Sequence, residues 1–282
     1  MKLNQDLKIS AVICCYHGVK TIYNSLESLY YQSLSKQFYE VIIIDNGSVD
    51  GSSIVIENFM KEKKTENFYV YRIINEGLSN ARNKGYNVAN SDIIFYMDDD
   101  ACAERDCLKN IIEEFKGNVN VVGGKVDILN KKNNFAVLYH NSIFRFWLEK
   151  IKIIIGTNMS FKKSLLIKTG GFIKDLKYRG DESAFFEKNK KLIKHSINNN
   201  IVVFHTQPEK LNNFLKSRFE NGLSKAYINF KFNNNDTKSK LRSLCFLIVR
   251  FLTSGLIFPI SFFLVGIDYL AHETIYLFSL FF

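Results

Sequence analysis

The sequence lacks the short motifs of the common nucleotide- and metal-binding loops. No GxGxxG follows a predicted strand and no GxxxxGK[ST] occurs, which excludes ordinary dinucleotide and P-loop sites. The cysteines form neither a CxxC pair nor a Cys/His spacing typical of zinc sites. Other side chains must therefore bind any nucleotide or metal.

An apolar leader is also missing from the first residues, MKLNQDLKIS, so we expect no secretory signal. Two of the five cysteines, Cys14 and Cys15, lie in an apolar run, where buried and reduced thiols are expected. Both features favour a reducing compartment. We expect the main folded part of the chain to lie in the cytosol.

Hydrophobic residues make up 46% of the 282 residues and aromatic residues 14%, which excludes a disordered chain. The length suits one large α/β domain, or one domain plus an appendage. The net charge of +10 is concentrated late in the chain, because residues 188–242 hold twelve Lys/Arg against three Asp/Glu. Such a segment can contact nucleic acid, anionic lipid or phosphorylated substrates.

The segment after this basic stretch favours a membrane. Residues 251–267 carry no charge and would extend about 25 Å as a helix at ~1.5 Å per residue. A basic stretch before an apolar one suits the cytoplasmic face of a membrane. We expect residues 226–282 to form a helical tail, basic and then hydrophobic, that associates with the cytoplasmic side of the cell membrane. We expect no nucleic-acid partner. The alternative is a buried pair of C-terminal helices.

The first 126 residues alternate short apolar runs with helical patterns. The runs are Val/Ile-rich without strict alternation, as in strands covered on both faces. They are Ile9–Cys15, Val41–Asp45, Phe68–Ile74, Ile93–Met97 and Val121–Val126, and the helices start near Thr21 and cover Ser52–Lys61, Leu78–Ala89 and Arg105–Phe115. This alternation predicts an α/β fold with a mainly parallel, doubly wound sheet and helices on both faces.

The pattern after Lys131 is less regular. We expect a strand with a polar loop over Ile151–Phe161, a turn at Gly170–Phe172 and a short strand at Ile201–His205. The Asn-rich stretches 198–200 and 233–235 read as loops.

Polar residues follow the predicted strands where ligands of such sheets bind. These are Tyr16-His17, Asp45 to Ser48, and the triplet Asp98-Asp99-Asp100. Three adjacent carboxylates repel one another unless a cation neutralises them, and Mg²⁺ or Mn²⁺ prefers carboxylate oxygen. In an extended segment Asp98 and Asp100 point to one side and Asp99 points away. A solvated acidic turn before a helix is the alternative.

Five blocks in a fixed order carry a family resemblance. They are SAVICCYHG, EVIIIDNGSVDGS, NEGLSNARNKGYNVANSDIIFYMDDDA, GTNMSFKKSLLIKTGGF and RGDES. Together they resemble the family 2 glycosyltransferases of the GT-A fold over about residues 8–225. The resemblance implies a domain of residues 1–225, with a nucleotide-binding half (1–126) and an acceptor half (127–225), before the tail of residues 226–282.

The resemblance also implies roles for site residues. Asp45, Cys15, Tyr16 and Arg82 would bind the nucleotide near its base, Asp98 and Asp99 would complete the nucleotide site, and Asp98, Asp100 and His205 would hold a divalent metal, Mn²⁺ or Mg²⁺. The pair Cys14-Cys15 replaces the Pro-Thr that the family usually has before the tyrosine.

The catalytic base is implied by an acidic pair after the GGF turn. The family's common order is Glu-Asp, whereas this chain has Asp181-Glu182. Alignment on Gly180 makes Glu182 the base, with Asp181 as the second choice.

The resemblance implies an inverting, metal-dependent transfer of a sugar from a nucleotide-diphosphate sugar to an acceptor hydroxyl. A UDP-sugar donor and a glycan or glycolipid acceptor are favoured, in the synthesis of a surface polysaccharide or glycolipid. Two alternatives stay open: a nucleotidyltransferase acting on a sugar phosphate, and a membrane-attached binding protein with a degenerate site.

Overall fold

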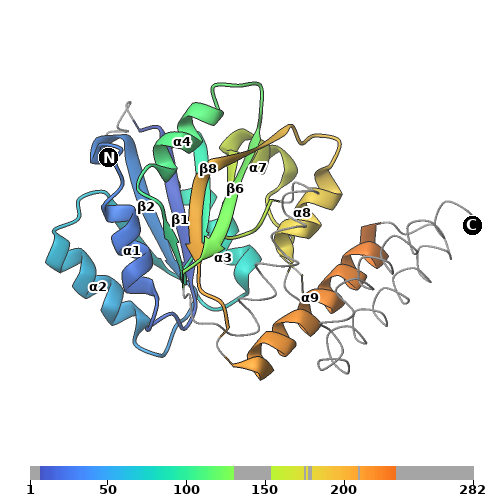
Figure 1. Ribbon diagram of the computed structural model, residues 1–282, viewed down its shortest axis with the longest axis horizontal. Coiled ribbons are helices and arrows are strands. Elements are labelled where there is room, and N and C mark those ends of the chain that lie inside the picture. The colour runs from blue at the N-terminus through green and yellow to red at the C-terminus, as the bar shows by residue number, and fades with distance from the viewer. Residues whose placement is uncertain (1–6, 130–153, 175, 177–179, 209, 233–282) are drawn as a thin grey trace, which may run out of the picture. The chain divides into compact units, whose positions relative to one another are not determined.

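The computed structural model describes residues 7–129, 154–174, 176, 180–208 and 210–232 (Figure 1). The chain divides into two compact units. The first comprises Met1–Asn133, Trp147–Lys177 and Asp181–Gln207, and the second includes helix α9 (Leu211–Phe232). This helix crosses the domain boundary expected at residue 225, and that boundary stays a prediction. The tail lies outside the described residues after Phe232.

One sheet forms the centre of the first unit (Figure 1). Its described strands follow the order β3-β2-β1-β4-β7-β6-β8-β5. In chain order they are β1 (Ile9–Cys15), β2 (Tyr39–Asp45), β3 (Phe68–Arg72), β4 (Ile93–Asp98), β5 (Ala101–Ala103), β6 (Val121–Ile128), β7 (Met159–Lys162) and β8 (His195–His205). The run β3-β2-β1-β4 is parallel, β6 and β8 are parallel, and β7 and β5 run antiparallel to their neighbours. The expected α/β sheet is confirmed, with a mixed second half.

Helices cover both faces of this sheet, as expected. They are α1 (Ile22–Tyr30), α2 (Ser52–Lys63), α3 (Leu78–Val88), α4 (Cys107–Glu114), α7 (Lys163–Thr169) and α8 (Asp181–Asn189), with a short 3-10 turn η1 (Lys36–Phe38). Alternate residues of each strand point to opposite faces, so Ile13 packs into the core with α1, α2 and α4, and Val12 into the core with α3, α7 and α8. All four helices expected in the first 126 residues are present.

One local prediction is wrong. Residues 198–200 are not a loop but part of β8, which begins at His195. Polar side chains are tolerated there because Asn198 and Ser196 both hydrogen-bond to Glu114 of α4, and the register shifts by a bulge opposite Gly124 and Lys125. The polar loop expected within residues 151–161 is present as a turn at residues 156–158, and strand β7 follows it from Met159; residues 151–153 lie outside the described part of the chain.

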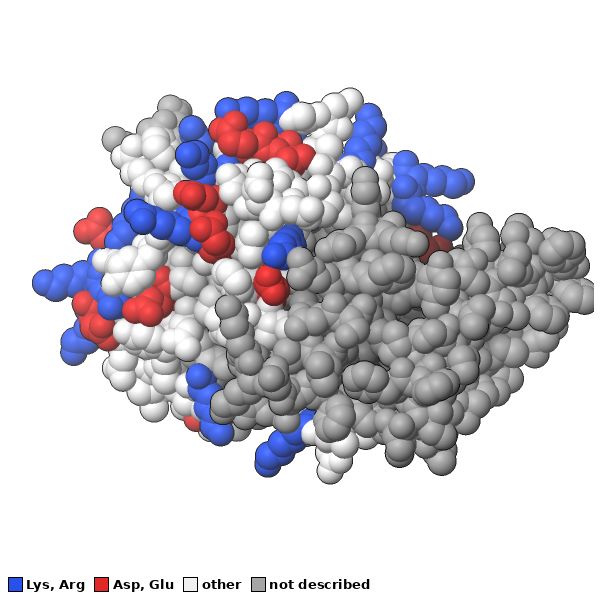
Figure 2. All heavy atoms as spheres, viewed as in Figure 1, with Lys and Arg blue, Asp and Glu red and all other residues white. Residues whose placement is uncertain are grey.

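Charged side chains of both signs are interspersed on the described surface that Figure 2 shows. This face therefore offers no continuous basic stripe for a phosphate backbone among the described residues. None of the described helices is long and apolar enough to cross a membrane.

A close approach to β1 fixes the position of helix α3, which carries Ala81-Arg82-Asn83 (the ARN block). Gly85 faces Val12, and a Cβ at Gly85 would overlap the Val12 side chain. Two residues earlier, Asn83 exchanges two hydrogen bonds of 2.8 Å with the backbone of Phe172 in the GGF turn. The ARN and GGF blocks are thus physically joined.

We expect Gly85→Ala to lower the free energy of unfolding by about 1–3 kcal/mol, because the added methyl overpacks this contact. Gly117→Ala is the matched control, since its Cβ would meet only the Glu114 carbonyl oxygen at 3.4 Å. Both changes remove similar backbone entropy from the unfolded chain. Chemical denaturation of the two variants measures the difference, and equal stabilities would contradict the packing account.

Candidate active site

The carboxyl ends of β1, β2 and β4 meet at one edge of the sheet. In the strand register Cys15 lies beside Asp45, and Cys14 lies beside Asp98. The polar residues after these strands are therefore neighbours, as expected for a parallel sheet. Residues from β8, α3 and α8 complete the group.

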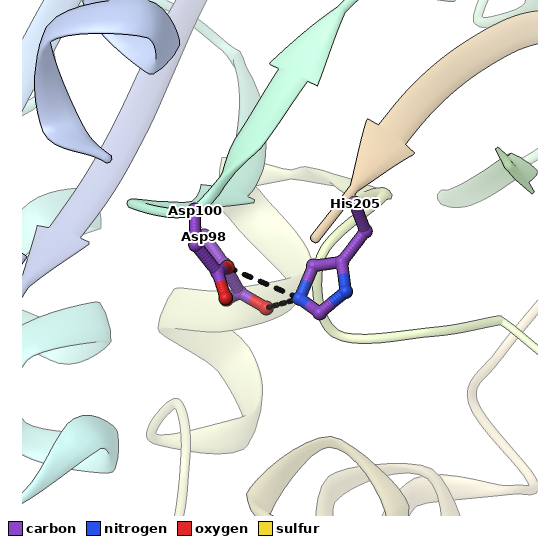
Figure 3. Close-up of side chains that lie close together, drawn as sticks. All are labelled: Asp98, Asp100 and His205. Atoms are coloured by element: carbon purple, nitrogen blue, oxygen red, sulfur yellow. Dashed lines mark ion pairs between the residues drawn. The ribbon is translucent and has the colours of Figure 1, made fainter. Parts of the chain in front are cut away.

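Asp98, Asp100 and His205 form a cluster (Figure 3). The Nε2 atom of His205 lies 3.1 Å from Asp100 Oδ1 and 3.8 Å from Asp98 Oδ2. The strand pairing explains this approach, because Ala101 of β5 lies opposite His205 of β8. The structure thus brings together the three residues expected to bind metal.

This donor set fits a divalent cation. One ligand atom from each residue lies within 4.8 Å of the other two, and all three side chains are partly exposed. Two carboxylates and an imidazole suit Mn²⁺ or a similar ion, and the open side leaves coordination positions for phosphate oxygens.

Asp99 points away from the cluster, as expected, although residues 99 and 100 form a turn after β4 rather than an extended segment. Its Oδ2 accepts a hydrogen bond of 3.1 Å from the Tyr16 backbone N–H, and its carbonyl oxygen accepts one of 2.8 Å from the Ser25 hydroxyl. Burial raises the pKa of Asp99 to about 7, and the neighbouring charge of Asp100 adds to this. Asp99 therefore ties the loop after β1 to the acidic triplet; its contact with a nucleotide stays a prediction.

Asp45 is buried with both carboxylate oxygens occupied. Oδ1 accepts a 3.0 Å hydrogen bond from the Ser48 backbone N–H, and Oδ2 accepts one from the Ser53 hydroxyl. These contacts shape the loop after β2. The nucleotide contact expected of Asp45 stays a prediction.

The next residue, Asn46, was expected only as one of the polar residues at this strand end, with no role of its own. Its Nδ2 donates to Asn75 Oδ1 at 3.2 Å, whereas its buried Oδ1 has no hydrogen-bond partner among the described residues. An unsatisfied buried acceptor costs about 1–3 kcal/mol, so a ligand N–H at this strand end would be stabilising. The available signal was its place directly after Asp45 at the end of β2.

Tyr16 and Cys15 were also expected to contact the nucleotide. The Tyr16 side chain is 48% exposed, and its ring stacks on that of His17 with the ring centroids 4.0 Å apart. An exposed ring at this edge can pack on a nucleotide base. The Cys15 side chain is buried, which raises the pKa of its thiol to about 12, and the Asn46 N–H occupies its carbonyl oxygen. Both nucleotide roles stay predictions.

Arg82 lies among three carboxylates. Its side chain is 3% exposed, and its guanidinium nitrogens lie 2.6 Å from Asp181 Oδ2, 3.4 Å from Asp98 Oδ1 and 3.8 Å from Glu182 Oε2. Burial alone would lower the pKa of Arg82, but Asp181 and Asp98 raise it above its usual value. Its expected contact near the nucleotide base stays a prediction.

The acidic pair opens helix α8, which was not expected from the sequence. The Asp181 side chain is buried against Arg82, whereas that of Glu182 is 25% exposed. Burial raises the pKa of Glu182 to about 7, Asp181 adds to this, and Arg82 opposes it. The two carboxylates therefore have different environments: one is a buried ion-pair partner, and the other can exchange a proton near neutral pH.

The model of glycosyl transferase family 2 matches residues 10–170, more than half of the chain. The chain therefore belongs to glycosyltransferase family 2.

Two curated relatives illustrate the range of similarity. A dolichyl N-acetyl-α-D-glucosaminyl phosphate 3-β-D-2,3-diacetamido-2,3-dideoxy-β-D-glucuronosyltransferase of Methanococcus voltae is 28% identical over 77% of this chain and 73% of its own length. A poly-β-1,6-N-acetyl-D-glucosamine synthase of Staphylococcus epidermidis is 30% identical over 60% of this chain and 42% of its own length. Several relatives are thus matched over less than two thirds of their length, with shares of 29%, 59% and 42% in three cases.

Solved structures share the fold. The mannosyltransferase PcManGT of Pyrobaculum calidifontis, in complex with GDP-Man and Mn²⁺, superposes with a TM-score of 0.67 at 17% identity, over 94% of this chain and 80% of that one. S. aureus TarS 1–349 with UDP-GlcNAc gives 0.61 at 19% identity, over 91% and 76%. The chain therefore has the GT-A type of fold that the sequence blocks implied.

We expect Mn²⁺ to raise the midpoint temperature of unfolding, because an ion that binds only the native state stabilises it. His205→Ala and Asp100→Asn should each abolish most of the shift. Asp92→Asn is the matched control, since Asp92 is an exposed carboxylate at the opposite end of β4. Differential scanning fluorimetry over a Mn²⁺ titration measures the shifts, and unchanged shifts in the two site variants would exclude this metal site.

Proposed function

We propose that the protein is an inverting, metal-dependent glycosyltransferase that moves a sugar from a nucleotide-diphosphate sugar to an acceptor hydroxyl. One observation carries the proposal: the guanidinium of Arg82 contacts both the cluster of Asp98, Asp100 and His205 and a carboxylate that can accept a proton. Asp98 belongs to the cluster, Glu182 is the carboxylate, and Arg82 lies within 4 Å of both.

A nucleotide diphosphate would bind along the edge where β1, β2 and β4 end. The free Oδ1 of Asn46 and the exposed ring of Tyr16 are suited to hold a base, by hydrogen bonding and stacking respectively. Solved structures with the same fold hold UDP, UDP-GlcNAc or GDP-Man. We favour a UDP-sugar donor.

Asp98, Asp100 and His205 would hold the Mn²⁺ or Mg²⁺ ion. When bound, the ion supplies positive charge that stabilises the departing diphosphate. In the transfer itself, the acceptor oxygen forms a bond to the anomeric carbon while the bond from that carbon to the diphosphate oxygen breaks. The carboxylate of Glu182 takes the proton of the acceptor hydroxyl. In-line displacement inverts the anomeric centre.

Glu182 is a better base than Asp181 on physical grounds. Asp181 is buried and held at 2.6 Å by the guanidinium of Arg82, which hides it from an acceptor. Glu182 keeps part of its side chain exposed, and burial raises its pKa to about 7. A general base is most effective when its pKa lies near the pH at which the enzyme works.

Two further observations bear on the acceptor and on the cellular site. We favour a glycan or glycolipid acceptor, since relatives are named for transfer to dolichyl-linked sugars and for synthesis of poly-β-1,6-N-acetyl-D-glucosamine. The basic and apolar sequence of residues 226–282 supports a membrane-associated protein on the cytoplasmic side. Neither alternative function is favoured: family membership argues against a nucleotidyltransferase, and the ordered acidic cluster argues against a degenerate site.

Donor binding should depend on metal. We expect UDP to raise the midpoint temperature of unfolding much more with Mn²⁺ than with EDTA, and the dependence to vanish in Asp100→Asn. Asn46→Ala should weaken UDP binding about 5- to 100-fold, because one buried hydrogen bond is worth about 1–3 kcal/mol. Isothermal titration measures the affinity. Binding of UDP that is indifferent to Mn²⁺ would refute the proposed donor site.

Replacing the base should separate binding from chemistry. We expect Glu182→Gln to keep UDP affinity within threefold and to lower the transfer rate by about 10²–10⁴-fold. In the wild type, kcat/KM should fall about tenfold per pH unit below pH 7, because protonated Glu182 cannot accept a proton. Product analysis across pH 5–9 measures both effects. Full activity of Glu182→Gln would identify another base.

A further inference from the structure

Arg82 forms ion pairs with a member of the metal-type cluster, Asp98, and with both members of the acidic pair, Asp181 and Glu182. Among the described residues, no other charged side chain pairs with both groups. Arg82 extends from α3, whereas its partners come from three other places: the end of β4, the loop before β7 and the start of α8. A planar guanidinium can serve several acceptors at fixed angles, which an ammonium group cannot do.

The surroundings of Arg82 are built for this side chain. Gly156 accepts a 3.3 Å hydrogen bond through its carbonyl oxygen, and a Cβ there would lie 2.9 Å from the guanidinium. The ring of Phe172 lies under the guanidinium carbon at 5.6 Å. The glycine leaves the space, and the ring covers one face of the group.

Burial decides what kind of role Arg82 can have. With 3% of the side chain exposed and its nitrogens directed to Asp98, Asp181 and Gly156, little of the group is left to touch a donor sugar. Its charge instead acts on the groups beside it. Around Glu182 the charged neighbours are Asp181, which disfavours ionisation, and Arg82, which favours it.

We propose that Arg82 is a positioning residue that fixes the donor-side carboxylate Asp98 and the base Glu182 relative to each other. Asp181 serves as the anchor of the guanidinium, so that Arg82 keeps one orientation while Glu182 stays partly exposed. The inference rests on the proposed transferase function and adds to it, because it gives the ARN block a role in alignment rather than in contact with the nucleotide base.

The test compares two variants. Arg82→Lys keeps the positive charge but loses the planar guanidinium, and Arg82→Gln loses both the charge and the guanidinium. Both should lower kcat about 100-fold, the effect of misplacing a reacting group by about 1 Å, while the affinity for UDP with Mn²⁺ changes less than kcat does. Arg82→Gln should also move the acidic limb of the pH–rate profile to higher pH, since Glu182 loses the neighbouring cation. Arg82→Lys should leave that limb near its wild-type position.

Lys84→Gln is the matched control, because Lys84 is an exposed cation two residues away on α3; its kcat and pH profile should match the wild type. If the Arg82 variants fail to fold, Gly156→Ala gives a second route, since the added methyl displaces the guanidinium without removing a charge. We expect it to lower kcat several-fold at unchanged UDP affinity.

Wild-type kcat in Arg82→Lys and in Gly156→Ala would overturn the inference while leaving the proposed function intact. A raised KM for the donor sugar with unchanged kcat would do the same, because it would mean direct donor contact. A folded wild type that transfers no sugar from any nucleotide sugar would instead refute the proposed function, and the inference with it.

Discussion

The arrangement of the site depends on one buried charge. Arg82 would be costly inside the protein without partners, and it is stabilised by Asp181 at 2.6 Å and by Asp98 at 3.4 Å. The same contacts restrain β4, α3 and α8. The neighbouring Asn83 binds the GGF turn through Phe172, so two adjacent residues on one helix connect three distant sequence blocks. Blocks that are separate along the chain thus meet at this helix.

The electrostatics divide the acidic residues into working and supporting groups. Asp98 and Asp100 face His205 and solvent, where their charges can attract a cation. Asp99 turns inward to hold the loop that carries Tyr16, and burial raises its pKa to about 7. Asp181 and Glu182 divide similarly. Asp181 is buried against Arg82 at 2.6 Å, and burial raises the pKa of the neighbouring Glu182 to about 7.

The sequence predicted the parts that depend on periodicity and strand order. The strands and helices of the first 126 residues follow from apolar spacing, and their carboxyl ends follow from parallel pairing. Three features needed tertiary information. Polar Asn198 lies in a strand because Glu114 binds it; the acidic pair opens a helix; and the free acceptor of Asn46 is set by the fold around it. The contacts of Arg82 could not be predicted from the sequence either, because an arginine on a helix is usually exposed.

We propose that Asp98, Asp100 and His205 hold a metal ion beside the diphosphate of a nucleotide-sugar donor. The most direct measurement is an anomalous-scattering map from crystals grown with Mn²⁺ and UDP. We expect one strong peak ligated by these three side chains and by diphosphate oxygens, with the base near Asn46 and Tyr16. Bound UDP with no metal peak at this cluster, or a peak that does not contact the diphosphate, would contradict it.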